Sequence, residues 1–235
     1  LYTTQADSGW HLVGNPYGAT IDWDDASSWT KTNTDQTIYV WEPDEKSYKT
    51  WNGTTGSLGS GLIKPFQAFW VKANDNNPQL TVSEDAKTFG GTFVGKLAAD
   101  RNPEIEIQLS RQDNTNSIYF AFYDGAKVGK DPRDGFYLQP PPGVESYSEI
   151  YSISRSMGRY SINALPLNFG VPIEIPISAN VLQNGKKITD SVKLQIAKIK
   201  NIPNSWDLTL VDRLTGRELS PSPSLNYQFT TDGIN

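Results

Sequence analysis

The feature that most constrains the fold is an alternation of apolar and polar residues that recurs in short segments along the chain. Ile105, Ile107 and Leu109 alternate with two acids and an amide, and residues 191–200 and 206–211 repeat the pattern. Successive side chains of a strand point to opposite faces, so each segment predicts a strand with apolar residues in a core and polar residues in water. One-sided strands are typical of antiparallel sandwiches rather than of buried parallel sheets.

Glycine (19 residues) and proline (15 residues) separate segments that are rich in β-branched and aromatic residues. Residues 24–29 and 180–184 could each form a single helical turn. We therefore expect an all-β chain with few or no helices. Strands are expected near residues 10–13, 37–41, 47–51, 66–72, 79–82, 104–109, 117–123, 149–154, 159–163, 171–177, 191–200, 206–211 and 226–229.

The tryptophans indicate where the chain divides. Six of the seven occur before residue 71, and aliphatic alternation dominates the second half. We therefore expect two antiparallel β-sandwich domains, jelly-roll or immunoglobulin-like, that span residues 1–88 and 89–235. The alternative is one continuous sandwich with an elaborated edge.

Composition excludes several kinds of chemistry. Cysteine is absent and His11 is the single histidine, so disulfides, cysteine nucleophiles and two-histidine metal sites within one chain are excluded. A Ser-His-Asp triad would need His11, but the sequence has no Gly-x-Ser-x-Gly elbow to present a serine. The net charge of −5 argues against a nucleic-acid partner. No apolar run reaches the ~18–20 residues of a membrane helix, so we expect no transmembrane segment.

Motifs with a fixed order run through most of the chain. Residues 9–17 read Gly-Trp-His-Leu-Val-Gly-Asn-Pro-Tyr, and Ile-Asp-Trp follows at 21–23. Residues 38–53 predict a hairpin with aromatics on both arms, and 63–72 predict a strand that contains Pro-Phe-Gln-Ala-Phe-Trp-Val-Lys. The second half adds an Asp-rich turn at 131–135, Glu-Ile-Tyr-Ser at 149–152, Tyr-Ser-Ile-Asn-Ala-Leu-Pro at 160–166, Leu-Thr-Leu-Val-Asp-Arg-Leu-Thr-Gly at 208–216 and Tyr-Gln-Phe-Thr at 227–230.

In this order the motifs resemble the β-sandwich segment that precedes the C-terminal sorting tail in type IX secretion substrates, which are large secreted and cell-surface bacterial proteins. The resemblance implies a location outside the outer membrane and brings no known catalytic residue. The family continues past the Phe-Thr motif into a further strand and the tail. We therefore expect the tail to be absent from this chain, which begins at Leu1 and ends at Asn235, and the chain to be a processed or excised piece.

The resemblance implies a non-catalytic module of a larger secreted protein that acts in adhesion, in presentation or as a stalk near the anchored end. Its partner would be a polysaccharide or another surface protein. One alternative is a carbohydrate-binding accessory module of a secreted hydrolase. Another is a glycoside hydrolase, whose chemistry needs two carboxylates and neither histidine nor cysteine. A purely structural spacer is the third.

Trp29 and Trp51 are the candidate ligand-binding residues, because both lie at loop or hairpin ends where exposure is expected. Aromatic faces stack on sugar rings and anchor protein interfaces. The alternative is that the tryptophans fill a small core, and the alternating strand positions of Trp10, Trp41 and Trp70 favour this for those three.

Two acidic clusters are candidate Ca²⁺ sites, and calcium is the one cofactor that the sequence suggests. The first combines Asp124 with Asp131 and Asp134 of an Asp-Pro-Arg-Asp-Gly turn, and the second lies within residues 22–25. The residues at 22–25 lack the spacing of an EF-hand. Helix capping and turn formation account for the same residues without a metal.

Overall fold

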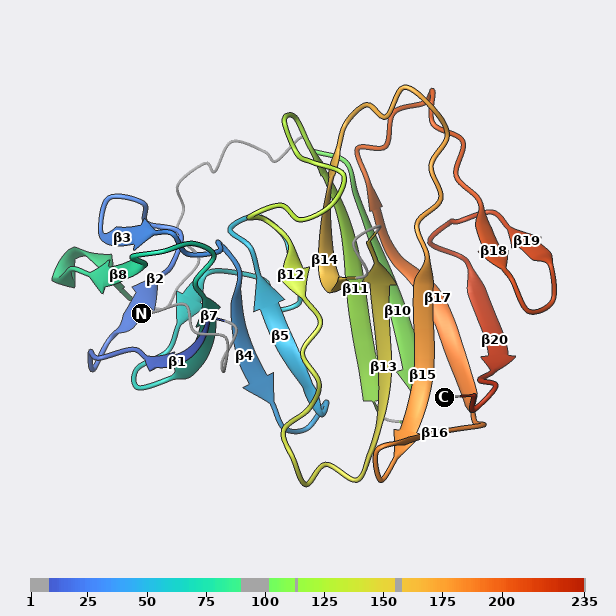
Figure 1. The fold of residues 1–235 in the computed structure, drawn as a ribbon, viewed down its shortest axis with the longest axis horizontal. Helices are drawn as coiled ribbons and strands as arrows, with labels where there is room; N and C mark the ends of the chain where they lie inside the picture. Colours follow the sequence, from blue (N-terminus) through green and yellow to red (C-terminus); the bar gives the residue numbers. More distant parts are fainter. Residues whose placement is uncertain (1–8, 90–101, 113, 155–157, 235) are drawn as a thin grey trace. The chain divides into compact units, whose positions relative to one another are not determined.

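The computed structural model describes residues 9–89, 102–112, 114–154 and 158–234. These residues form an all-β structure with several sheets, consistent with a sandwich architecture (Figure 1). The helical element among them is a single 3₁₀ turn, Glu84–Ala86, and none of the described residues belongs to a helix that could cross a membrane. Two compact units make up the chain: Leu1–Glu42 with Tyr48–Asp100 and Asp131–Gly135, and Pro43–Ser47 with Arg101–Lys130 and Phe136–Asn235.

Three small sheets build the first unit. The largest has the strand order β1 (Trp10–Gly14), β7 (Ala68–Lys72), β4 (Ile38–Glu42), β5 (Ser47–Trp51). The second has the order β6 (Leu62–Ile63), β2 (Thr20–Asp22), β9 (Lys87–Thr88), and the third pairs β3 (Trp29–Thr32) with β8 (Gln79–Val82).

The core of the first unit forms around Trp23, which is 1% exposed. Its ring packs edge-on against Phe69, with centroids 6.0 Å apart. Phe69 and Val71 point from β7 into this core, whereas Trp70 is half-buried on the other face of the strand. Trp10 and Trp41 are also half-buried and outside this core, so the expectation that these three tryptophans fill the core was wrong. The strand begins at Ala68 after a turn, and its two-residue period then directs Phe69 and Val71 inward.

One large sheet dominates the second unit. Its strand order is β16 (Lys186–Ile188), β15 (Ile177–Gln183), β13 (Ser146–Ile153), β14 (Arg159–Pro166), β11 (Asn114–Tyr123), β10 (Glu104–Arg111), β17 (Ser191–Lys200), β20 (Asn226–Thr230). The short β12 (Gly135–Phe136) pairs with β14, and β18 (Leu210–Asp212) and β19 (Arg217–Leu219) form a separate hairpin.

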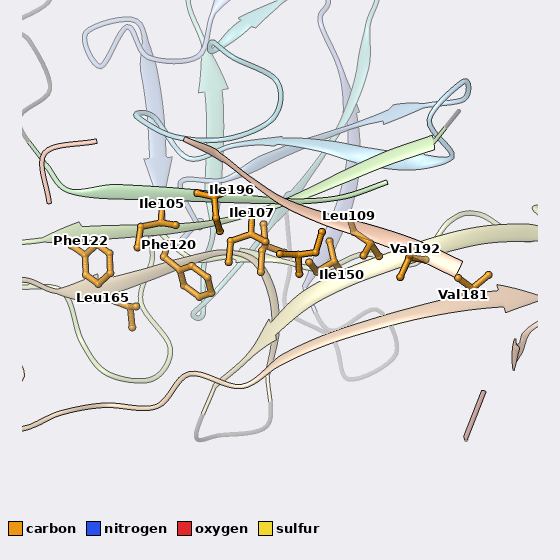
Figure 2. Packing of buried hydrophobic residues seen from close by; sticks show 12 residues of the cluster. Ile105, Ile107, Leu109, Phe120, Phe122, Ile150, Leu165, Val181, Val192 and Ile196 are labelled. Carbon is orange, nitrogen blue, oxygen red and sulfur yellow. The ribbon is translucent and has the colours of Figure 1, made fainter. Parts of the chain in front are cut away.

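The apolar side chains of this sheet share one face. Ile107 lies opposite Ile118 of β11 and opposite Ile196 of β17, so three strands contribute to one layer. Figure 2 shows Ile107 and Ile196 in a row of side chains that extends to Val192 and Val181. Those two valines come from β15 and β17, which are far apart in the strand order, so the sheet curls over its own apolar face.

Two details of the second unit differ from the expectations. Strands β11 and β14 are parallel, with Tyr119 opposite Ile162, although alternation predicted antiparallel sheets. Alternation specifies which face a side chain takes but not the direction of the neighbouring strand. Glu104, expected in water, is 3% exposed, and its carboxylate accepts a hydrogen bond from Lys198 at 2.9 Å.

Most of the expected strands form, but the expectations missed the short strands β2, β3, β6, β9, β12, β16 and β19 and were wrong in two extended segments. Residues 171–176 are irregular, and the neighbouring strand is instead Ile177–Gln183, where a helical turn was expected. Residues 206–211 contribute only Leu210–Asp212 to a strand, and no helical turn forms at 24–29. The predicted domain junction between residues 88 and 89 adjoins residues 90–101, which lie outside the described part of the chain, and the division into domains 1–88 and 89–235 stays a prediction.

Candidate functional site

Trp29 and Trp51 are half-buried and pack against the core of the first unit. The Trp29 indole N–H donates to the backbone carbonyl of Asp22 at 2.7 Å, and its ring packs edge-on against Trp23 with centroids 4.8 Å apart. The Trp51 indole N–H donates to both carboxylate oxygens of Asp24, at 3.0 and 2.9 Å. Both side chains therefore have a structural role, whether or not they also bind a ligand.

The Lys31 ammonium lies close to the rings of Trp23 and Trp29 and interacts with neighbouring carboxylates. Its Nζ lies 3.8 Å from the Trp23 ring centroid and donates to the backbone carbonyl of Trp23. Burial lowers the pKa of Lys31 from 10.5 to about 8, against the opposing effect of Asp24 and the neighbouring carboxylates. Burial also raises the pKa of Asp24, although the hydrogen bond from Trp51 opposes that shift. Gly61 makes room for the Asp24 carboxylate, because a Cβ there would lie 2.6 Å from its Oδ2.

Replacing Trp51 by phenylalanine is expected to reduce the free energy of unfolding by about 1–2 kcal/mol. The substitution removes the hydrogen bond to the carboxylate of Asp24 together with part of the ring that packs against the core. Urea unfolding followed by tryptophan fluorescence measures the change, because most tryptophans belong to the first unit. Lys64→Ala, at an exposed position of the first unit, serves as a control with little effect. An unchanged midpoint in Trp51→Phe would show that this hydrogen bond contributes nothing.

The stability of the first unit is expected to rise by about 1–2 kcal/mol between pH 8 and 10, a figure that allows for the partial exposure of Lys31. The unfolded chain keeps Lys31 protonated up to its ordinary pKa of 10.5, whereas the folded pKa is about 8. The unfolded state therefore binds more protons in this window, and stability increases with pH. Urea midpoints at intervals of pH would show the rise in the native chain and a flatter profile in Lys31→Met. Identical pH profiles in the native chain and in Lys31→Met would show that Lys31 does not cause the rise in stability.

Two of the three predicted calcium residues, Asp131 and Asp134, are used in turn formation. Asp131 and Asp134 are 4% and 1% exposed and belong to the first unit. The Asp134 carboxylate accepts the backbone N–H of Asp131 at 2.7 Å, and the Asp131 carboxylate accepts the N–H of Arg133 at 3.0 Å. Asp124 is exposed and belongs to the second unit. In the described ranges no group of three or more His, Asp or Glu side chains could hold a metal ion.

The second acidic cluster is used in the same way. Asp22 accepts the backbone N–H of Asp24 at 2.9 Å, and Asp25 accepts hydrogen bonds from the hydroxyls of Ser27 and Ser28 at 2.6 and 2.7 Å. These hydrogen bonds lower the pKa of Asp25. Because Asp24 accepts the hydrogen bond from Trp51, the three carboxylates of this cluster have different partners and do not converge on one metal position.

The second unit contains the larger candidate site, an apolar groove of about 1610 Å³. Its floor is the apolar face of the curled sheet, built by β10, β11 and β17. Its walls are the segments 167–176 and 205–215 together with β15 and β20. We call this site the groove. Its floor and wall residues include Ile105, Ile107, Phe120, Phe122, Leu194, Ile196, Phe169, Ile175, Trp206, Leu208, Tyr227 and Phe229.

The rim of the groove exposes large apolar side chains to water. Val171, Leu214 and Ile234 line the groove and are 66%, 75% and 68% exposed. An ion pair between Glu174 and Arg213 connects the two wall segments. An open, mostly apolar concavity with a few polar groups is the usual form of a ligand site.

Sequence reasoning missed the groove because its lining comes from segments that are far apart in the chain. The available signal was the alternation of Leu167, Phe169, Val171, Ile173 and Ile175, which was interpreted in part as a strand at 171–177. In the structure this alternation instead places Leu167, Phe169 and Ile175 over the apolar face of the sheet.

Comparison with protein-family models, with curated proteins and with solved structures finds no match to this chain. The resemblance to the type IX segment rests on the sequence motifs alone and stays a prediction.

Proposed function

We propose that the chain is a non-catalytic binding module of a larger secreted or cell-surface protein, with jelly-roll or immunoglobulin-like sandwich domains, and that it acts in adhesion or presentation. The observation that supports this function is the groove. It combines a volume of about 1610 Å³ with an apolar floor and exposed apolar residues at its rim. The floor side chains are largely covered, since Ile105, Ile107 and Ile196 are 8%, 4% and 2% exposed, so the apolar surface offered to a ligand is mainly that of the rim. Exposed apolar side chains that gather at one place mark interaction sites.

Binding of Nile red, an apolar fluorescent dye, tests the groove directly. The native chain should enhance and blue-shift the dye emission with saturable binding. Ala179 is half-buried at the groove wall, so Ala179→Phe should fill part of the groove and weaken dye binding about tenfold or more. Ala68 is exposed in the first unit, and Ala68→Phe is the matched control. Circular dichroism confirms that both variants are folded.

Two results would contradict the proposal. One is the absence of dye binding to the native chain. The other is equal dye affinity in Ala179→Phe, Ala68→Phe and the native chain, which would place the dye outside the groove. The carbohydrate-binding alternative stays a prediction, and its test is polysaccharide binding by Trp29→Ala and Trp51→Ala variants that remain folded.

A further inference from the structure

The two edges of the large sheet in the second unit are built differently. Strand β16 forms one edge, is three residues long, and has the sequence Lys-Lys-Ile. Strand β20 forms the other edge, is five residues long, and has the sequence Asn-Tyr-Gln-Phe-Thr. Short edges with lysines resist pairing with another chain, whereas longer uncharged edges accept it. The lysines thus protect β16, while β20 has neither a charge nor a proline.

The open edge of β20 borders the groove. Residues 227–230 of this strand line it, and β20 pairs with β17 on one side and with no other strand in the described part of the chain. The side chains of Tyr227 and Phe229 stack with ring centroids 5.6 Å apart, and Phe229 packs against the apolar core. A row of backbone donors and acceptors therefore borders the groove.

The opposite wall is less suited to pairing. Segment 167–176 contains Pro172 and Pro176, which have no backbone N–H to donate. The Gly170 N–H is already bonded to the side chain of Asn168 at 2.9 Å. Hydrogen bonding to a ligand is thus expected along β20, and apolar contact along the rim and the other wall.

We propose that the groove binds an extended peptide strand of a partner protein, which pairs with β20 and directs alternate apolar side chains toward the exposed apolar residues of the groove rim. An acyl chain or a sterol would fill the apolar space but could not satisfy the backbone groups of β20. A strand satisfies both, because its backbone pairs at the edge while every second side chain points to one face. The five residues of β20 correspond to a span of about 17 Å at ~3.4 Å per residue. This inference rests on the proposed function, because it names the class of ligand that the groove takes.

Capped peptides with the sequence Lys-Thr-Val-Thr-Val-Thr-Val-Thr-Lys are the probe, with the full chain as the receptor. Successive backbone N–H groups of a strand point to opposite edges. Two matched peptides are therefore made, one N-methylated at the valines and the other at the threonines. We expect the parent peptide to bind, one methylated series to lose affinity about tenfold or more, and the other to stay within about threefold. A peptide of the same composition with contiguous valines should bind as weakly as the disrupted series.

The outcomes separate the two proposals. Equal retention or equal loss of affinity in the two methylated series overturns strand pairing, because one edge of the ligand must differ from the other. Failure of the parent peptide to bind, while Nile red still binds and is lost in Ala179→Phe, overturns strand pairing but leaves the groove as an apolar site. Failure of both peptide and dye overturns the proposed function as well.

Discussion

Replacing Trp23 by alanine is expected to lower the free energy of unfolding of the first unit by about 3–5 kcal/mol. Trp23 is 1% exposed and packs edge-on against Trp29 and Phe69. Its indole N–H donates to the backbone carbonyl of Gln36 at 2.8 Å, and Lys31 lies over its ring. The substitution leaves a cavity, an unsatisfied carbonyl and a half-buried ammonium without its ring contact. Each consequence destabilises the folded state.

Urea unfolding followed by fluorescence of the remaining tryptophans measures this change. Trp41→Ala is the matched control, because Trp41 is half-buried and makes one tilted contact with Tyr48 at 5.1 Å. Its cost should be less than half as large. If Trp23→Ala and Trp41→Ala cost the same, Trp23 is not the centre of the core.

Replacing Asn15 by aspartate is expected to cost about 3 kcal/mol or more. Asn15 is 3% exposed, and its side-chain amide donates to the backbone carbonyls of Ala19, Ile63 and Lys64 at 2.8, 3.1 and 3.0 Å. Its oxygen accepts the N–H of Tyr17 at 2.9 Å. The aspartate keeps this acceptor but places a carboxylate against three carbonyl oxygens.

Thermal and urea unfolding give the size of the effect. Asn77→Asp is the control, because Asn77 is exposed and its positive φ of 53° is one that aspartate tolerates. A loss in Asn15→Asp that matched the small change in Asn77→Asp would mean that the three carbonyl bonds do not hold this turn. Because an ionised aspartate causes the damage, the deficit should also shrink as the pH falls through the carboxyl range.

The all-β architecture was predictable because the alternation of Ile105, Ile107 and Leu109 is a direct consequence of strand geometry. The strand at 191–200 was predicted at its observed bounds for the same reason. Strand β15 was missed because its polar residues are buried rather than exposed. Asn180 is 6% exposed and donates to the carboxylate of Glu149, its partner in the strand register, at 3.0 Å.

The candidate site was less predictable than the fold. Trp29 and Trp51 were expected at exposed ends, yet their indole N–H groups are bonded within the first unit, which depends on how Asp22 and Asp24 fold back. Predicting the groove from the sequence required knowing that β15 and β17 contribute to one core cluster, although the two strands are far apart in the strand order of the sheet. Local pattern does not contain that information.

The central claim, that the groove of the second unit is an accessible binding surface, is tested most directly by methyl NMR of the native chain under xenon pressure. Xenon enters accessible apolar cavities and shifts nearby methyl resonances. We predict dose-dependent shifts for Ile105, Ile107 and Ile196 on the groove floor and none for Ile21 and Ile38 in the core of the first unit. Unshifted floor methyls, or shifts of equal size in both sets, would contradict the account.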